Sequence, residues 1–361
     1  MAMRKQLKDI CRGFTKNIAL KDLGQHEGQF PIYGASGYIK DVDFYCCDTP
    51  YIGIVKDGSG VGRVDVYPGY SSLLGTMQYI VPNDEVDLRY LKYALTAMDL
   101  GSLYKGAAIP HIYFKEYGKF FVDLPDLETQ KHISASLDTI QKAIDLKRKQ
   151  LQDLDELVKS KFQEMFGDVD GYKCLRDYSS LITKGASPRW QGLTYQESGV
   201  LFITSENVRE GYLDVSKAKY LDDGINKLLP RSILQKGDIL INIVGASIGR
   251  AAIFDIDQLA NINQAVAVVR PIENGIDIHF LIEYLNSQRA MELYDSMKQG
   301  GARDNLSLKN IADLLIPDVS VSKQKEFSVL VRKRNELKEI VIKEIADLEE
   351  LMDSKMDEYF G

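Results

Sequence analysis

The segments Gln130–Gly167 (QKHISASLDTIQKAIDLKRKQLQDLDELVKSKFQEMFG) and Gln324–Gly361 (QKEFSVLVRKRNELKEIVIKEIADLEELMDSKMDEYFG) align without a gap at a constant offset of 194 residues. About a third of the aligned positions are identical, far more than chance gives in unrelated segments. The identical residues include Asp153, Leu154, Glu156, Leu157, Ser160, Lys161, Glu164 and Phe166, each matched 194 positions later. The chain therefore contains an internal repeat.

The repeat extends upstream with short gaps. The turn GSGVGR at Gly58–Arg63 matches GASIGR at Gly245–Arg250, and both follow runs rich in β-branched residues. DLRYLKYAL at Asp87–Leu95 matches DIHFLIEYL at Asp277–Leu285. A loop follows each of these segments, and each copy then reaches a short predicted strand that ends at a proline, Pro125 or Pro317. The glycine-rich turns lack G-K-[ST] and are not followed by a helix pattern, so they indicate strand-to-strand turns rather than nucleotide-binding loops.

These matches predict an α+β chain in which two β-rich domains alternate with two long helices. A chain of 361 residues is longer than most single domains, which fits this division. The expected parts are residues 1–129 (first domain), 130–167 (central helix), 168–323 (second domain) and 324–361 (second helix). Residues 167–172 join the two copies.

Apolar residues recur at alternating three- and four-residue steps along both long segments, a spacing typical of helices that pack through a narrow seam. The seam positions are Leu137, Ile140, Ile144, Leu151, Leu154 and Val158 in the first segment, with Lys147 at the position between Ile144 and Leu151, and Val341, Ile345, Leu348 and Met352 in the second. The economical arrangement is that the two helices pack on each other; the alternative is that each stripe packs on its own domain. At about 1.5 Å per residue, about 36 helical residues make a rod of roughly 54 Å, long enough to act as a spacer.

Composition excludes several classes of protein. The net charge is −7, so bulk positive charge cannot hold a nucleic acid; local clusters or a partner must do so. No apolar stretch is long enough to span a membrane and no secretory leader is evident, which predicts a cytoplasmic protein. The four cysteines show no metal-ligand spacing and are expected to be reduced thiols.

No catalytic motif is present. The sequence has no H-E-x-x-H and no G-x-S-x-G, and its four histidines are not paired with cysteine or carboxylate at ligand spacing. Pro125-Asp126 and Pro317-Asp318 are not followed by the acidic-x-lysine pattern of a nuclease. We therefore expect no active site and no metal site in this chain.

Several polar, glycine-containing loops are suited to contacting DNA, because Arg, Lys, Ser, Asn and aromatic side chains contact base edges and phosphates. Solvated turns, and a core position for Trp190, are the alternatives for these loops. The candidates in the first copy are Tyr33, Ser36, Lys56, Ser59, Arg63, Lys105 and His111. Those in the second copy are Lys184, Ser187, Arg189, Trp190, Ser205, Asn207, Arg209, Ser247, Arg250, Arg303 and Asn305.

The organisation resembles that of the specificity subunits of type I restriction-modification systems, and the resemblance covers essentially the whole chain. It rests on FPIYGASGYI (30–39), FITSENVREGYL (202–213) and GDILINIVGASIGRAAIF (237–254), and on the proline followed by Gln-Lys at the start of each long helix. The resemblance implies two target-recognition domains that each bind one half of a bipartite DNA site. It also implies that the two helices form an antiparallel coiled coil with pseudo-two-fold symmetry.

The same resemblance implies partners and cofactors that the sequence itself does not encode. Two modification subunits, which bind S-adenosylmethionine and methylate adenine, would dock on this chain. Two restriction subunits that use ATP and Mg would add DNA cleavage, while this chain would bind no cofactor and carry no catalytic activity.

Two other classes of function remain open at the level of sequence. A stand-alone DNA-binding module with duplicated domains would need no methyltransferase partner and would bind its site tightly by itself. A structural protein whose helices merely link two β-rich domains would show no sequence-dependent DNA binding.

Overall fold

The computed structural model describes residues 3–103, 111–188, 192–298 and 304–361. The chain divides into two compact units, which we call unit 1 (Met1–Lys149 and Ile342–Gly361) and unit 2 (Gln150–Val341). Each unit thus holds one β-rich domain together with a stretch of both long helices, α4 (Leu127–Phe166) and α9 (Val321–Phe360). This division differs from the sequence-based one, which kept each helix whole.

Both long helices begin three residues earlier than the sequence pattern predicts. At the start of α4, the Asp126 carboxylate accepts hydrogen bonds from the Thr129 N–H (2.9 Å) and the Thr129 hydroxyl (2.9 Å). These bonds lower the pKa of Asp126, and they satisfy a backbone donor that the first helical turn leaves unpaired. The aspartate after Pro125 is therefore a helix cap. Each helix is 40 residues long, or about 60 Å.

Within its described residues, the domain of unit 1 contains three sheets and five short helical segments. The sheets have the strand orders β1-β9, β2-β8-β5-β6 and β4-β3-β7, with β3 and β7 parallel and every other pair antiparallel. The strands are β1 Met3–Gln6, β2 Cys11–Phe14, β3 Phe30–Gly34, β4 Gly37–Val42, β5 Tyr51–Val55, β6 Val64–Tyr67, β7 Ser72–Leu73, β8 Met77–Pro82 and β9 Phe121–Leu124. The helical segments are α1 Leu7–Ile10, η1 Leu20–Gln25, α2 Leu88–Ala97, η2 Leu100–Leu103 and α3 Phe114–Tyr117, of which η1 and η2 are 3₁₀ turns.

Unit 2 repeats this topology strand for strand. Its sheets have the orders β10-β18, β11-β17-β14-β15 and β13-β12-β16, and the one parallel pair, β12 with β16, again lies in the three-stranded sheet. The strands are β10 Tyr172–Cys174, β11 Ser179–Lys184, β12 Val200–Ile203, β13 Lys219–Leu221, β14 Ile239–Asn242, β15 Ala251–Ile253, β16 Ala260–Ile262, β17 Val266–Pro271 and β18 Leu315–Pro317. The helical segments are η3 Leu175–Tyr178, α5 Gly224–Leu228, η5 Pro230–Ser232, η6 Gly245–Ser247, α6 Ile278–Leu285, α7 Gln288–Met297 and α8 Leu308–Ala312.

The glycine-rich segments are strand-to-strand turns in both units, as the sequence indicated. Gly58 and Gly62 between β5 and β6, and Gly245 and Gly249 between β14 and β15, all have φ between +82° and +95°. Only glycine adopts this conformation readily. Each second glycine also packs too closely for a Cβ, against Gly101 in unit 1 and against Tyr294 in unit 2.

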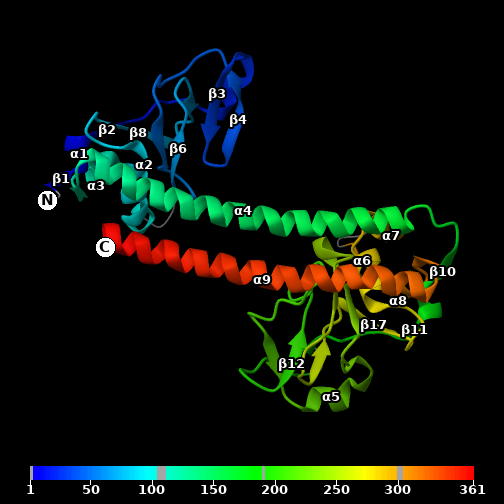
Figure 1. Ribbon diagram of the computed structural model, residues 1–361. Helices are drawn as coiled ribbons and strands as arrows, with labels where there is room; N and C mark the ends of the chain where they lie inside the picture. Colours follow the sequence, from blue (N-terminus) through cyan, green and yellow to red (C-terminus); the bar gives the residue numbers. More distant parts are fainter. Residues whose placement is uncertain (1–2, 104–110, 189–191, 299–303) are drawn as a thin grey trace. The chain divides into compact units, whose positions relative to one another are not determined.

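The two long helices pair in antiparallel fashion within each unit (Figure 1). In unit 1 the Lys147 ammonium lies 2.6 Å from the Glu344 carboxylate. In unit 2 the Lys338 ammonium lies 2.9 Å from the Asp155 carboxylate, and Lys323 donates to the Met165 carbonyl (2.9 Å). Of the predicted seam, Leu137, Ile140, Ile144, Val158 and Val341 are buried, and Leu151, Leu154, Ile345, Leu348 and Met352 are half-buried.

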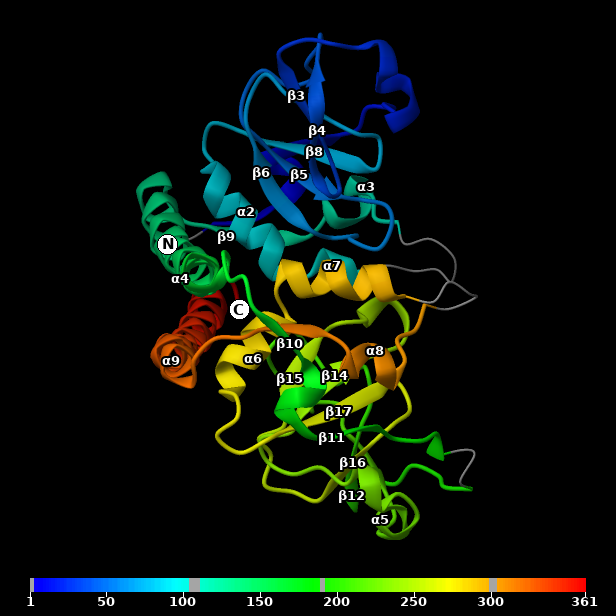
Figure 2. The same cartoon turned by 90° about the vertical axis from the view of Figure 1, so that its right-hand side faces the viewer.

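The apolar stripes of the long helices pack both on the partner helix and on the domain of the same unit. The main core of unit 1 joins β2, β5 and β8 to α2 and to Leu137 of α4, and Met356 and Phe360 of α9 close it. The main core of unit 2 contains Phe162 and Phe166 of α4 and Phe327 of α9. In each unit the three-stranded sheet lies farther from the long helices than the four-stranded sheet (Figure 2).

Candidate nucleic-acid interface

Backbone hydrogen bonds gather the candidate loops of unit 2 at one end of its domain. The Asn263 N–H donates to the Ile203 carbonyl (3.0 Å), and the Ile243 N–H donates to the Ala265 carbonyl (2.9 Å). The Leu306 N–H donates to the Ile243 carbonyl (2.9 Å). A Cβ on Gly185 would lie 1.8 Å from the Ile262 carbonyl oxygen, so the loop that begins at Lys184 also approaches this end closely.

The equivalent bonds gather the loops of unit 1. The Leu74 N–H donates to the Tyr33 carbonyl (2.9 Å), the Lys56 N–H to Thr76 (3.0 Å) and the Ile112 N–H to Lys56 (3.1 Å). Each domain thus presents one loop end, built from the ends of the same strands. We call these the unit 1 loop end and the unit 2 loop end.

The structure brings most of the unit 1 candidates together. Ser36, Ser59, Arg63 and His111 are exposed. The Tyr33 ring is half-buried and contacts the rings of Tyr38 and Tyr67, at centroid distances of 6.2 and 4.9 Å. Four of the unit 1 candidates thus have exposed side chains, and the Tyr33 ring packs between two neighbouring tyrosines.

Asp57 joins two of the unit 1 candidates, and the sequence did not predict this role. Its carboxylate lies 3.0 Å from the Lys56 ammonium and also pairs with the His111 imidazole. The two candidates come from different segments of the chain, and the carboxylate holds both. The sequence signal was only that Asp57 lies between Lys56 and the glycine turn.

The unit 2 candidates are spread between exposed and half-buried positions. Lys184, Arg250 and Asn305 are exposed, whereas Ser187, Ser205, Arg209 and Ser247 are half-buried. Arg209 lies 3.6 Å from the Asp214 carboxylate. The pKa of Asp214 is lowered, first by hydrogen bonds from Ser216 and then by Arg209.

The structure corrects the prediction that Asn207 contacts DNA. Its side chain is only 6% exposed, and its Oδ1 accepts from the Thr204 N–H (2.9 Å) while its Nδ2 donates to the Asp214 carbonyl (2.9 Å). A buried amide that both accepts and donates within its own loop is not available to a base edge. Asn207 therefore shapes the loop rather than contacting DNA.

Asn242, at the end of β14, is a second residue that the sequence analysis missed. It is fully buried, and its Nδ2 lies within hydrogen-bonding distance of the Ser205 carbonyl (3.0 Å), the Val208 carbonyl (3.3 Å) and the Ser247 hydroxyl (3.1 Å). One amide thus ties the loop after β12 to the turn after β14. The only sequence signal was an asparagine at the end of an otherwise apolar run.

An exposed arginine occupies the same position in both loop ends. Arg63 and Arg250 each follow the second glycine of the turn, and each backbone carbonyl accepts from the strand residue opposite, Val55 (3.0 Å) or Asn242 (2.9 Å). Both side chains are exposed, and neither forms an ion pair within the described part of the chain. An arginine left without a carboxylate partner is suited to phosphate or to guanine.

Four candidates lie outside the described residues: Lys105, Arg189, Trp190 and Arg303. Among the residues that are described, no three His, Cys, Asp or Glu side chains form a group that could hold a metal ion. Over the same residues, no helix is long and apolar enough to cross a membrane.

Comparison with known proteins places this architecture in a family. Residues 2–156 and 191–346 match the type I restriction modification DNA specificity domain. A curated relative, the type I restriction enzyme EcoBI specificity subunit of Escherichia coli, is 25% identical over 288 residues, which are 71% of this chain. The match spans 60% of the length of that relative.

Two solved structures share the fold. The specificity subunit of a type I restriction-modification system from M. genitalium superimposes with a TM-score of 0.61 at 15% identity, covering 100% of this chain and 96% of that one. A chain from a structural study of the assembly and conformational transition of a type I system superimposes with a TM-score of 0.59 at 14% identity. It covers 99% of this chain and 97% of that one. With two domain matches over most of its length and a repeated recognition fold, this chain belongs to the type I restriction-modification DNA specificity family.

Proposed function

We propose that this chain is the sequence-reading subunit of a type I restriction-modification complex, and that each loop end reads one half of a bipartite DNA site. The observation that carries this proposal is the duplication of the loop end. Two domains of the same topology each present an exposed arginine at the same turn, Arg63 in unit 1 and Arg250 in unit 2, and neither arginine forms an ion pair with another described residue. The surrounding loops differ in sequence, as two readers of different half-sites require.

The other candidates have complementary roles in this proposal. Ser36, Ser59, Lys184 and Asn305 are exposed donors and acceptors at the two loop ends. These exposed groups are supported or flanked by Tyr33, Lys56, His111, Ser187, Ser205, Arg209 and Ser247. Four further candidates stay predictions from the sequence: Lys105, Arg189, Trp190 and Arg303. Phosphate contacts position a protein on DNA, and base-edge contacts give the sequence preference.

The long helices support docking of two copies of one partner. The residues that are identical between the two helices include a set spaced by alternating steps of three and one, which places them on one helix face. We call this set the repeated face: Asp153, Glu156, Leu157, Ser160, Lys161 and Glu164 in unit 2, and Asp347, Glu350, Leu351, Ser354, Lys355 and Glu358 in unit 1.

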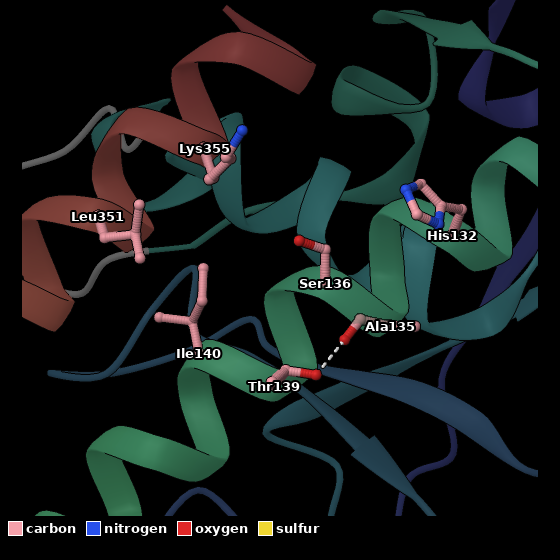
Figure 3. A pocket seen from close by; sticks show the side chains of 7 residues that line it. All are labelled: His132, Ala135, Ser136, Thr139, Ile140, Leu351 and Lys355. Atoms are coloured by element: carbon pink, nitrogen blue, oxygen red, sulfur yellow. Dashed lines mark hydrogen bonds between the residues drawn. The ribbon is translucent and has the colours of Figure 1, made fainter.

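Core packing does not explain why these residues are the same in both copies. Leu157 is 56% exposed and Leu351 is 44% exposed. The ion pairs Lys161–Glu164 and Lys355–Glu358 have the same length, 2.6 Å. In unit 1 the face borders a groove in which Leu351 and Lys355 of α9 lie opposite Ser136 and Ile140 of α4 (Figure 3). Identical exposed surface on both copies favours two copies of one partner.

We propose that these partners are two adenine-methyltransferase (modification) subunits, which bind S-adenosylmethionine. Restriction subunits that use ATP and Mg would add cleavage. The chain itself supplies no catalytic group in this proposal, and partner subunits supply part of the phosphate neutralisation that a chain with a net charge of −7 lacks.

The test is co-expression of this chain with a type I modification subunit in cells, followed by sequencing of methylated adenines. We expect one bipartite motif, and weak, salt-sensitive DNA binding by the purified chain alone. Tight, specific binding by the chain alone at physiological salt would instead favour a stand-alone DNA-binding module. Absence of any sequence-dependent methylation or binding would contradict the proposed function.

The repeated face has its own test. Leu157→Glu and Leu351→Glu should each reduce the number of modification subunits that co-purify with the chain from two to one, and the double variant should retain none. Leu259→Glu, at a 65% exposed leucine away from the long helices, is the matched control. Unchanged stoichiometry in the double variant would overturn this docking surface.

A further inference from the structure

A buried glutamine of α4 fastens the domain of unit 1 to the helix. Gln130 is 1% exposed; its Oε1 accepts from the Asp87 N–H (2.8 Å), and its Nε2 donates to the carbonyls of Pro125 (2.8 Å) and Glu85 (3.1 Å). One turn later, the Ser134 hydroxyl donates to the Asp87 carboxylate (3.0 Å). Asp87 is the N-cap of α2, where its carboxylate accepts from the Tyr90 N–H (2.8 Å).

The same contacts recur in unit 2 between α9 and α6. Gln324 is fully buried; its Oε1 accepts from the Asp277 N–H (2.8 Å), and its Nε2 donates to the Val319 carbonyl (2.7 Å). The Ser328 hydroxyl donates to the Asp277 carboxylate. Asp277 is the N-cap of α6 and accepts from the N–H groups of His279 and Phe280. We call each set of three residues a polar joint: Gln130, Ser134 and Asp87 in unit 1, and Gln324, Ser328 and Asp277 in unit 2.

A polar joint constrains the orientation of the domain on its helix more tightly than the surrounding apolar contacts do. Burial of apolar surface is non-directional, so a helix can slide or tilt over an apolar patch at modest cost. Hydrogen bonds from a buried amide require particular distances and angles, and leaving any of them unmade in the interior is unfavourable. Each joint ties a long helix to the capped end of a domain helix and so fixes the angle between them.

The joint is retained where the sequence around it has changed. Over the first twenty residues of the aligned long segments, the residues identical to their counterparts are Gln130, Lys131, Ser134 and Lys149. On the domain side, Asp87 matches Asp277, whereas Arg89 and Tyr93 are replaced by His279 and Glu283. The joint residues are thus kept while the helices that carry them diverge, which points to a requirement shared by both units.

We propose that Gln130, Ser134 and Asp87, and likewise Gln324, Ser328 and Asp277, are positioning residues that fix the orientation of each recognition domain on its helix. A bipartite site has a fixed gap only if both readers are held at fixed angles to the helices. The joints therefore restrict the gap between half-sites that the chain accepts. This inference rests on the proposed function, but its first test does not require DNA.

The first test measures orientation within unit 1 of the full chain. Spin labels are attached at two positions of that unit, Lys21 in η1 and Lys142 on α4. Both side chains are exposed. The labels are introduced in a background with Cys46→Ser and Cys174→Ser, which leaves the buried Cys11 and Cys47 in place. We expect a single narrow distance peak that broadens in Gln130→Leu. The exposed neighbour Glu128→Gln is the control and should leave the peak unchanged.

The second test is methylation in cells that also carry the modification subunit. Gln130→Leu should keep both half-site sequences but also methylate sites whose gap is one base pair shorter or longer, and Gln324→Leu should do the same. If Gln130→Leu fails to fold, Ser134→Ala removes only the hydroxyl that donates to Asp87 and lies 3.2 Å from the Lys131 carbonyl, and it should give a smaller broadening in both measurements.

An unchanged label distance, or a broadened distance with an unchanged gap, in a folded variant would overturn the inference. If the unmodified chain supports no bipartite methylation, the proposed function fails, while the label distances still report on the joint. The two failures are therefore distinguishable.

Discussion

The two units agree in their scaffold and differ in the connection that follows the central strand of the three-stranded sheet. In unit 1, β3 and β4 are joined by the two-residue turn Ala35-Ser36. In unit 2, β12 and β13 are joined by residues 204–218, which carry Ser205, Arg209 and the buried Asn207. The same strand order thus supports loops of very different length, because sheet register and the polar joints do not depend on them.

The longer loop has its own anchor. Asn242 binds it from the end of β14, and the residue at the equivalent position of β5 is Val55, which is buried and apolar. Val55 needs no polar partner because the short turn of unit 1 leaves no loop backbone to hold. The anchor therefore belongs to the loop it serves rather than to the shared scaffold.

Replacing this anchor should produce the largest effect. Asn242→Ala removes the donor from two carbonyls and one hydroxyl in the interior and should lower the free energy of unfolding by about 3 kcal/mol. It should also abolish recognition of the unit 2 half-site. Val55→Ala, a smaller apolar truncation in unit 1, should leave that half-site readable. Chemical denaturation and methylome sequencing measure the two effects; retained reading of the unit 2 half-site by Asn242→Ala would contradict the anchor.

Removing the turn arginines tests whether the two loop ends act separately. Arg250→Ala should weaken recognition of one half-site by about 1 to 3 kcal/mol and leave the other unchanged. Arg63→Ala should do the reverse. Arg→Lys at either position keeps the charge but loses the bidentate geometry, so it should restore affinity more than sequence preference. Methylome sequencing gives the outcome, and equal loss at both half-sites from one substitution would exclude separate readers.

Lengthening the helices tests their role as a ruler. Because α4 pairs with α9 on both sides of the middle, at Lys147–Glu344 and at Asp155–Lys338, the insertion must be made in both helices. Four residues after Leu151 and four after Ile340 add roughly 6 Å, against about 3.4 Å per base pair of DNA. The gap should lengthen by one or two base pairs while both half-site sequences stay the same. An unchanged gap in an active protein would show that the helices do not set it.

The smallest effect is expected at the charge pairs between the helices. Lys147→Ala in unit 1 removes a single partly exposed pair and should change the free energy of unfolding by less than about 1 kcal/mol. Lys338→Ala in unit 2 should cost somewhat more, because its partner Asp155 also contacts Arg334, which pairs with Glu283 at 2.6 Å and is only 14% exposed. Urea denaturation compares the two variants, and a larger loss from Lys147→Ala would reverse this ranking.

The sequence predicted the scaffold well because the repeat doubled every signal. The seam positions Leu151, Leu154 and Val158, the glycine turns and the short strands before the long helices each have a counterpart in the other copy, so one copy supports the interpretation of the other. Both helix starts were missed by three residues. For α4 the reason is that Asp126 was not recognised as a cap. Boundaries depend on single hydrogen bonds, which a periodic pattern does not contain.

The site was predicted less completely, and the misses share a cause. Asp57, Asn242 and the Gln130–Asp87 bond join residues that are distant in sequence or lie in apolar runs, so residue type and spacing carry no sign of the partner. Asn207 was assigned to DNA from its residue type, but its burial reverses that assignment. Spacing shows which face a residue occupies, whereas hydrogen-bond partners become evident only once the loops are folded.

The division of the long helices between the units has a consequence for the order of folding. Unit 2 is one continuous stretch, Gln150–Val341, so all of its core residues are synthesised without interruption by another unit. The unit 1 core also contains Met352, Met356 and Phe360, which are synthesised about 200 residues after the rest of that core. The first domain to be made is thus the last to be completed, and during translation its apolar surface beside Tyr90 and Leu137 stays uncovered until the end of α9 arrives.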